Sequence, residues 1–368
     1  MESATQLSVA CRGRDNNLNL MRFLAATLVI FTHAFGLTDN GRFEPFARVF
    51  DLSGGDLGVD VFFVLSGFLV TRSWDGKTPA QFAWARCMRI YPGLWASVLV
   101  SVLIAGLLFA TVPALTFWSS HDTLAYLAHN LTMLPKLGAR LDLPHAFRSH
   151  EPTFNVSLWT LPLEIEMYIL LGVVGALLGL RARYAAALAL LGCGIVLVSK
   201  LTGSSHDLLE ARGRFMYFFF AGSLAYVLRD RITLSGRVAL ALLGLVLAGV
   251  AFSRSFLVRQ AALSLALPYL LLWFAYVPAG PIRKWNRLGD YSYGIYIYAA
   301  PIQIALVTLG VGTTPATNFA AAMAVALAFA VTSWHLLERR ALRIPLPRLL
   351  SREPSTGPVP RAADRAHR

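Results

Sequence analysis

The chain has 368 residues, of which 56% are hydrophobic and only 14% are charged, and its mean hydropathy is +0.56. So apolar a composition excludes a soluble globular domain. The net charge of +13 is typical of nucleic-acid-binding proteins, but the basic residues lie between long apolar runs and form no basic face, so we expect no nucleic acid as a partner. The composition indicates the lipid bilayer as the partner instead.

Several apolar runs are long enough to cross a bilayer, whose hydrocarbon core of about 30 Å requires roughly 20 apolar residues in each helix. Bounded by proline, glycine or charged residues, these runs predict spans at residues 17–37, 56–72, 92–112, 156–179, 183–200, 213–228, 236–252, 259–277, 290–310 and 316–338. The first run is too long for a signal peptide and lacks a cleavage site of small residues, so it should stay as a membrane anchor. We therefore predict an all-α fold, a polytopic transmembrane bundle of about ten helices.

Basic residues set the orientation of the predicted bundle. They are more frequent in the segments on the side of both termini than in the segments on the opposite side, and the positive-inside rule then makes both termini cytoplasmic. We divide the chain into a cytoplasmic N-terminal segment at residues 1–16, a membrane domain at residues 17–343 and a basic, proline-rich tail at residues 344–368. The tail is polar, and we expect it to be disordered in the cytoplasm.

An arginine and a histidine lie within the first span, where an ionisable side chain costs at least about 2.5 to 3.5 kcal/mol. Arg22 and His33 are eleven positions apart, so they lie on nearly the same face of a helix, about 16 Å apart along its axis. Arg22 would lie near the cytoplasmic end and His33 toward the outer side. An anchoring arginine and a histidine bonded to a neighbouring helix are the structural alternatives.

This placement suits acyl transfer from a thioester of coenzyme A. The thioester is made in the cytoplasm, its phosphates suit the guanidinium group of Arg22, and its pantetheine arm is long enough to carry the acyl carbon into a membrane channel. The imidazole of His33 would deprotonate an acceptor hydroxyl or take the acyl group itself.

The second predicted span holds a small hydrogen-bonding patch and an acidic residue. Ser66 and Gly67, followed by Phe68, would let another helix approach closely or line a path for a slender substrate, and the sequence alone favours close packing. Asp60 lies toward the outer side, where it would orient or stabilise the imidazole of His33. An ordinary carboxylate at the membrane interface is equally consistent with the pattern.

Two further groups of charged residues are candidates for the same site. Arg86 and Arg89, on a cytoplasmic segment before the third span, share one face of a helical turn and would clamp the phosphates of coenzyme A. Positive-inside anchoring is the alternative explanation for this pair. Glu164 lies about two turns into the fourth span, where a buried carboxylate needs a partner such as His33, an arginine or a sugar hydroxyl of an acceptor.

The segment between the third and fourth spans, residues 113–153, is predicted to be a long outer loop that forms a lid or part of a surface for the acceptor. It holds four histidines, His121, His129, His145 and His150. Their irregular spacing favours solvated loop residues over zinc ligands, so we expect no metal.

In their order along the chain these segments resemble the acyltransferase 3 family, bacterial membrane proteins that O-acylate surface and exported glycans. Six patterns, spread over roughly residues 16 to 343, carry the resemblance: Arg22-x10-His33; Val61-Phe-Phe-Val-Leu-Ser66-Gly67-Phe68-Leu69; Arg86-x-x-Arg89 before Tyr91-Pro92; Ser157-Leu-Trp159-Thr-Leu-x-x-Glu164; Ser292-Tyr293-Gly-Ile-Tyr296; and Trp334-His-Leu-Leu-Glu338-Arg339. Each pattern alone is weak, but all six in order form a specific signal.

The resemblance implies that residues 17–343 form a membrane acyltransferase domain of ten helices in the bacterial inner (plasma) membrane, with acetyl-coenzyme A (acetyl-CoA) as the usual donor. It also implies roles for individual residues. His33 would be the catalytic residue, the donor would contact Arg22, Arg86 and Arg89, and the site would include Ser66, Gly67 and Phe68.

We therefore predict an O-acetyltransferase that moves an acetyl group from cytoplasmic acetyl-CoA to a sugar hydroxyl of an exopolysaccharide or lipopolysaccharide unit. Its catalytic candidates are His33, Glu164 and Asp60. The expected partners are a lipid-linked or nascent glycan and the polysaccharide biosynthesis machinery. Two alternatives stay open: the same chemistry with another acyl group or acceptor, such as succinyl, a lipid or an antibiotic, and a transporter, because buried charges also line substrate paths.

Overall fold

The long apolar runs fold as helices in the computed structural model, which describes residues 5–39, 44–134, 139–146, 153–201, 207–253 and 255–347. The α-helices are α1 (Leu7–Ala10), α2 (Leu18–Asp39), α3 (Pro45–Phe50), α4 (Gly54–Trp74), α5 (Pro79–Leu108), α6 (Ala114–Ser119), α7 (His121–Thr132), α8 (Leu161–Leu178), α9 (Ala182–Leu201), α10 (Asp207–Val227), α11 (Gly236–Phe252), α12 (Phe256–Tyr276), α13 (Ser292–Thr308), α14 (Pro315–Ser333) and α15 (Arg339–Ala341). A 3₁₀-helix at Val156–Thr160 leads into α8, another spans Pro281–Arg287, and a π-helical turn at Trp334–Glu338 joins α14 to α15. Two short strands, β1 (Thr5–Gln6) and β2 (Thr233–Leu234), pair antiparallel with Thr5 opposite Leu234.

The predicted all-α membrane bundle is confirmed. Among the described residues, seven helices are long and apolar enough to cross a membrane: α2, α4, α5, Val156–Leu178, α9, Leu257–Tyr276 and Pro315–Ala341. Two further apolar helices, α11 and α13, have 17 residues each, and α10 carries charged residues in its first turns. The number of ten crossings therefore stays a prediction. The tail beyond residue 347 lies outside the described residues.

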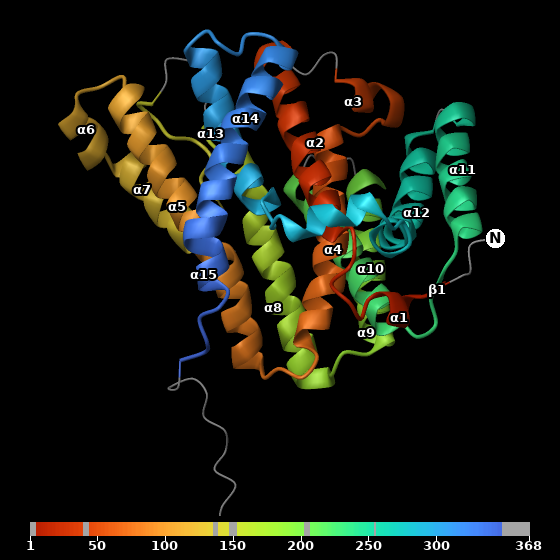
Figure 1. Ribbon diagram of the computed structural model, residues 1–368. Coiled ribbons are helices and arrows are strands. Elements are labelled where there is room, and N and C mark those ends of the chain that lie inside the picture. Colours follow the sequence, from red (N-terminus) through yellow and green to blue (C-terminus); the bar gives the residue numbers. More distant parts are fainter. Residues whose placement is uncertain are drawn as a thin grey trace, which may run out of the picture.

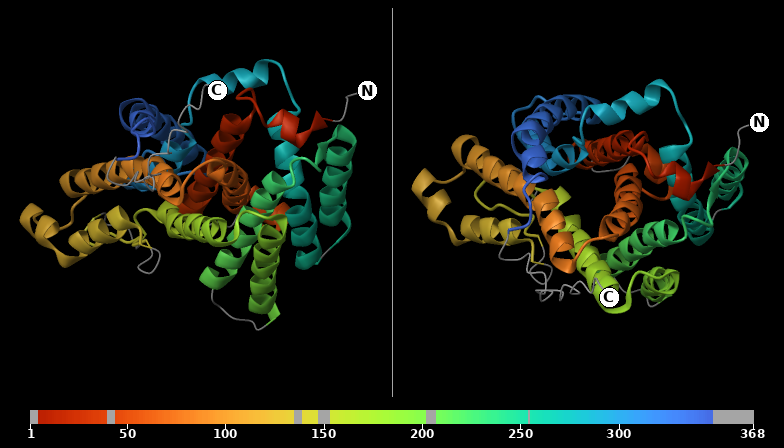
Figure 2. Two further views of the ribbon diagram at one scale, coloured as in Figure 1. Left: turned by 90° about the horizontal axis from the view of Figure 1, so that it is seen from below. Right: turned by 60° about the horizontal axis from the view of Figure 1, so that its bottom comes forward.

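The most buried of these helices is α4, in which 72% of the apolar stretch is buried inside the bundle. It packs between α2 and α10, while α13 and α14 pack against α2 (Figure 1). The α6–α7 pair extends from one flank of the bundle and the α11–α12 pair from the other (Figure 2). This arrangement places the side chains of α4 within reach of several other helices.

The helix that contains most of the third predicted span begins before that span, at Pro79. The side chain of Thr78 accepts a hydrogen bond from Gln81 N, and the side chain of Gln81 accepts one from Thr78 N. This reciprocal cap, followed by a proline at the first helical position, is a strong start signal, and the helix then continues through Pro92. The arginines of this segment consequently lie on α5 itself, where packing against other helices fixes their direction.

The predicted outer loop at residues 113–153 contains two helices, α6 and α7, in its described part. The side chain of Ser120 accepts a backbone N–H bond and caps α7. A hydrogen bond of 2.8 Å from the Tyr91 hydroxyl to the Thr132 carbonyl oxygen ties α7 to α5. The segment is therefore built onto the bundle, and His150 lies outside the described residues.

Gly67 lets α4 approach α10 closely. A Cβ added at Gly67 would lie 1.8 Å from the carbonyl oxygen of Phe219, and one added at Gly222 would lie 2.1 Å from the carbonyl oxygen of Val64. Small residues at such positions are typical of helix interfaces in membranes, where close backbone approach supplies the packing energy. Gly67 therefore serves helix packing, which is the interpretation that the sequence favoured.

We expect Gly67→Ala to destabilise the protein. The added methyl group would force α4 away from α10, and overpacking a tight interface typically costs about 1–3 kcal/mol. Gly36→Ala on α2 is the matched control, because a Cβ at Gly36 meets no atom within 4 Å. Thermal unfolding in detergent should show a lower midpoint for G67A alone. Equal midpoints for the two variants would contradict this account of the interface.

Candidate active site

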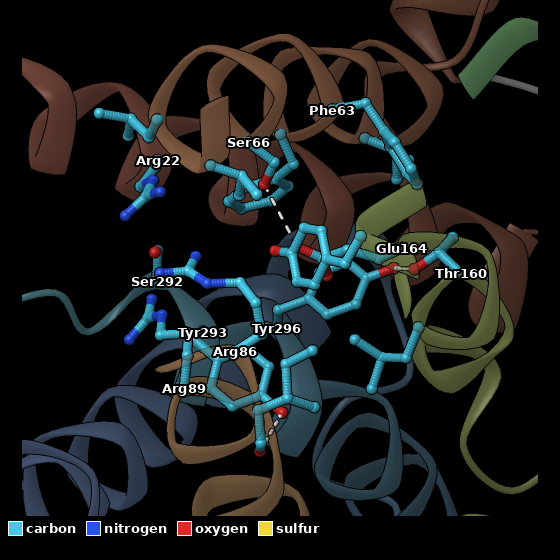
Figure 3. Close-up of a pocket in the computed structure, with 17 residues that line it drawn as sticks. Arg22, Phe63, Ser66, Arg86, Arg89, Thr160, Glu164, Ser292, Tyr293 and Tyr296 are labelled. Carbon is cyan, nitrogen blue, oxygen red and sulfur yellow. Dashed lines mark hydrogen bonds between the residues drawn. The ribbon is translucent and has the colours of Figure 1, made fainter. Parts of the chain in front are cut away.

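A pocket lies inside the bundle among α2, α4, α5, α8 and α13 (Figure 3). Most of its polar lining consists of basic, hydroxyl and aromatic side chains: Arg22, Ser66, Arg86, Arg89, Thr160, Tyr168, Ser292, Tyr293 and Tyr296. Glu164 is the acidic residue of the lining, and α4 adds an apolar stretch that runs from Val70 to Val59. The pocket thus combines a group of three arginines with an apolar wall formed by α4.

Arg22 and Arg89 share one carboxylate. Arg22 Nη1 lies 2.7 Å and Arg89 Nη2 lies 2.6 Å from Asp290 Oδ2, and Ser292 Oγ donates to the other oxygen at 2.5 Å. Asp290 lies in the loop before α13, outside the spanning helix. The carboxylate therefore holds both guanidinium groups.

Arg89 has a second acidic neighbour at the end of the α14 segment. Arg89 Nη1 lies 3.8 Å from Glu338 Oε2, and Ser333 Oγ donates to Glu338 Oε1 at 2.8 Å. Glu338 closes the π-helical turn, a local irregularity that is frequent at functional sites. The sequence interpretation assigned no role to Asp290 or Glu338. Their place at the ends of apolar helices was the available signal, because a buried carboxylate there needs a basic partner.

Arg86 differs from the other two arginines because no carboxylate of the described residues forms an ion pair with it. Arg86 Nη2 donates to Ser73 Oγ at 3.3 Å, and its guanidinium group lies 5.7 Å from the centre of the Tyr168 ring. Its buried Nε has no hydrogen-bond partner within the described parts of the chain. A guanidinium group with open donors beside a pocket is suited to bind an anion.

Glu164 is held by two hydroxyl groups. Ser66 Oγ donates to Glu164 Oε1 at 3.2 Å (Figure 3), and the Tyr168 hydroxyl, one turn further along α8, donates to the same oxygen. The partners of Glu164 are therefore a serine of α4 and a tyrosine of its own helix. The sequence had predicted His33, an arginine or a sugar hydroxyl instead. Nearby, the hydroxyl groups of Thr160 and Tyr296 share a hydrogen bond of 2.7 Å.

A family model described as an acyltransferase domain matches residues 15–335. The chain belongs to the acyltransferase 3 family. It is similar to an O-acetyl transferase of Shigella phage Sf6, with 27% identity over 358 residues that cover 91% of this chain and 98% of the phage protein. It is also similar to Nodulation protein 10 of Rhizobium leguminosarum bv. viciae, with 27% identity over 380 residues that cover 90% of this chain and 94% of that protein. No solved structure matches the chain significantly.

The protein is therefore an acyltransferase, as the resemblance implied. The structure brings five of the predicted site residues of this acyltransferase into one pocket, from four helices: Arg22, Ser66, Arg86, Arg89 and Glu164. Their individual roles in the reaction stay predictions.

His33 lies on α2 beyond the lining of this pocket. The pocket reaches Val59, and the neighbouring Gly58 packs against the backbone of Ala25. His33 is eight residues further along α2, which is about two helical turns. Its Nδ1 is buried and has no hydrogen-bond partner among the residues that the structure describes. The arginines thus line the pocket, whereas His33 lies outside its lining.

Asp60 has a different partner from the one expected. Its Oδ2 lies 2.5 Å from Arg214 Nη2 of α10, and the residue is only 1% exposed. The carboxylate therefore forms a buried ion pair, and no hydrogen bond to His33 is formed. The sequence could not indicate this pair, because it depends on the packing of α10 against α4.

Gly67 and Phe68 do not line the pocket. The ring of Phe68 packs in the core, with ring centres 5.4 Å from Tyr226 and 6.0 Å from Tyr276. Of the predicted patch at residues 66–68, only Ser66 therefore faces the pocket.

Proposed function

We propose that the chain is a multi-pass protein of the bacterial inner membrane that transfers an acetyl group from cytoplasmic acetyl-CoA to a sugar hydroxyl of an exopolysaccharide or lipopolysaccharide unit. The observation that carries the proposal is the arginine-lined pocket within a chain that matches the acyltransferase family over residues 15–335. Similarity over 91% of the chain to a phage protein named O-acetyl transferase supports acetyl as the transferred group. The distribution of basic residues supports cytoplasmic termini.

The arginine end of the pocket would receive the donor. Arg86, which has open donors, would bind a phosphate group, and the nitrogen atoms of Arg22 and Arg89 that Asp290 leaves free would bind others. The apolar stretch of α4 would hold the pantetheine arm. Glu164, fixed by its two hydroxyl partners, would accept a hydrogen bond from an amide N–H of that arm or assist the acceptor.

His33 would act in one of two ways. As a general base, its ring nitrogen takes the proton of the acceptor hydroxyl while the oxygen attacks the thioester carbonyl, and the C–S bond breaks to release the coenzyme A thiolate, which then takes up a proton. As an acyl carrier, the nitrogen attacks the thioester carbonyl first, and the C–S bond breaks to release the coenzyme A thiolate. The acceptor oxygen then attacks the acetyl group on the ring, the C–N bond breaks to restore the imidazole, and the thiolate takes up the proton of the acceptor hydroxyl. Both routes require the thioester to extend past Val59 toward His33.

The purified full chain in lipid nanodiscs tests this function. Acetyl-CoA with a glycan acceptor should give free thiol and acetylated glycan in equal amounts, measured with a thiol reagent and by mass spectrometry. Succinyl-CoA, lipid and antibiotic acceptors in parallel reactions test the same chemistry on other substrates. A transporter would move its substrate without releasing thiol, so transport without thiol release from any acyl donor would overturn the proposal.

A further inference from the structure

A second, basic pocket lies at the end of the bundle where α4 and α10 terminate. Three arginines from separate parts of the chain line it, and we call it the basic pocket: Arg12 of the N-terminal segment, Arg72 of α4 and Arg229 just after α10. Arg12 is exposed and the other two are half-buried, so the guanidinium groups are accessible.

The charges of the basic pocket are poorly compensated. Neither Arg12 nor Arg72 forms an ion pair with a carboxylate of the described residues, and the contact of Arg229 with Asp75 is long, at 3.7 Å. Asp230 is the one acidic residue in the described lining. In the active-site pocket, by contrast, two of the three arginines share the close carboxylate of Asp290, and Glu164 adds a second negative charge to the lining. The basic pocket therefore has the larger excess of positive charge.

Several contacts hold the walls of the basic pocket in place. The N-terminal segment is fixed by the pairing of β1 with β2 and by the Asn17 side chain, which donates to the Phe274 and Pro278 carbonyl oxygens at 2.9 Å. Arg72 Nη2 donates to the Arg12 carbonyl oxygen at 3.4 Å. The backbone at Arg12 and the guanidinium group of Arg72 are therefore held in place before an anion binds, which lowers the cost of ordering them.

The basic pocket and the active-site pocket both reach the same end of α4. Val70 lines the active-site pocket and Arg72 lines the basic pocket. Two residues correspond to a rise of about 3 Å and a rotation of about 200° along a helix, so the two side chains leave α4 on different faces. A ligand that contacts Arg72 therefore lies at the same end of α4 as the arginine group of the active site.

We propose that the basic pocket is a phosphate-binding subsite that holds a phosphate of the coenzyme A donor while its pantetheine arm enters the active-site pocket. This inference rests on the proposed function, since it concerns the same donor. Coenzyme A carries a 3′-phosphate and a diphosphate. Their combined negative charge is larger than the positive charge that Arg86 and the two carboxylate-bound arginines supply. The phosphate of an anionic lipid headgroup offers the same chemistry at a membrane surface, and the experiment distinguishes the two sources.

The test measures binding of adenosine 3′,5′-bisphosphate, the nucleotide end of the donor, to the full chain in nanodiscs of phosphatidylcholine. Calorimetry should show binding at least about tenfold weaker for the R12Q/R72Q double variant, because two charge-assisted contacts are lost. Arg181→Gln, an exposed arginine between α8 and α9, is the matched control and should bind as the wild type does. Arg12→Gln alone, at an exposed side chain, provides a second variant if the double variant does not fold, and it should also bind more weakly.

Kinetics with two donors separate this inference from the proposed function. The double variant should lose about tenfold in kcat/KM for acetyl-CoA and nothing for S-acetylpantetheine, which lacks the nucleotide phosphates. If the wild-type protein transfers acetyl but both variants bind the bisphosphate as tightly as it does, the subsite is wrong and the proposed function stands. If the wild-type protein binds the bisphosphate more tightly than the variants but transfers no acetyl group, the proposed function is wrong and the subsite stands. If the variants bind the bisphosphate normally but lose stimulation by phosphatidylglycerol in the nanodisc, the pocket binds lipid and the proposal is wrong.

Discussion

Replacing His33 with alanine should lower the rate of acetyl transfer by about 100- to 10,000-fold, the range expected for loss of a general base, or more if His33 carries the acyl group. Thiol release from acetyl-CoA in the presence of a glycan acceptor measures the effect. The fold should survive the change, because the buried Nδ1 of His33 has no partner in the described structure that alanine would leave unpaired.

The matched control is His121→Ala, at an exposed histidine of α7, which should keep wild-type activity. Mass spectrometry of the wild-type protein after reaction with acetyl-CoA alone separates the two mechanisms, since an acetyl group on the His33 peptide indicates the carrier. Full activity of H33A with correct folding would remove His33 from the mechanism and place the chemistry inside the arginine-lined pocket, near Glu164.

Asp290→Asn should reduce both stability and donor binding. The substitution leaves the guanidinium groups of Arg22 and Arg89 without their shared charged partner, and breaking a buried ion pair typically costs about 3–5 kcal/mol. The freed arginines would also lose the direction that suits the donor, so we expect a higher KM for acetyl-CoA.

Asp15→Asn is the control for this change. Asp15 pairs with Arg283 at 2.8 Å, but its side chain is 75% exposed, and removal of a surface ion pair should cost only about 0–1 kcal/mol. Unfolding in detergent compares the two variants, and steady-state kinetics reports KM. Equal stabilities, together with an unchanged KM for D290N, would show that Asp290 does not organise the site.

Much of the fold could be predicted from local patterns. A run of about 20 apolar residues forms a helix in a membrane whatever surrounds it, because the backbone must satisfy its own hydrogen bonds there. The predicted span at residues 156–179 therefore agrees closely with the helix at Val156–Leu178. The helix α5 begins before the third predicted span, because the capping signal at Thr78 lies outside the apolar run from which the span was predicted. The segment at residues 113–153 was taken for a loop because α6 and α7 are too short to span a membrane.

The sequence by itself also determined which ionisable residues are candidates for a functional site, since an arginine or carboxylate within an apolar run must have a partner. It could not determine which partner. Arg22 and Asp290 are 268 positions apart, and Arg214 is 154 positions from Asp60. These ion pairs, the contact of Ser66 with Glu164 and the separation of His33 from the pocket depend on how the helices are arranged about α4. The periodicity of the sequence predicts which residues share a face of one helix. Which helices pack against that face, and therefore which side chains form ion pairs, is decided by the tertiary structure.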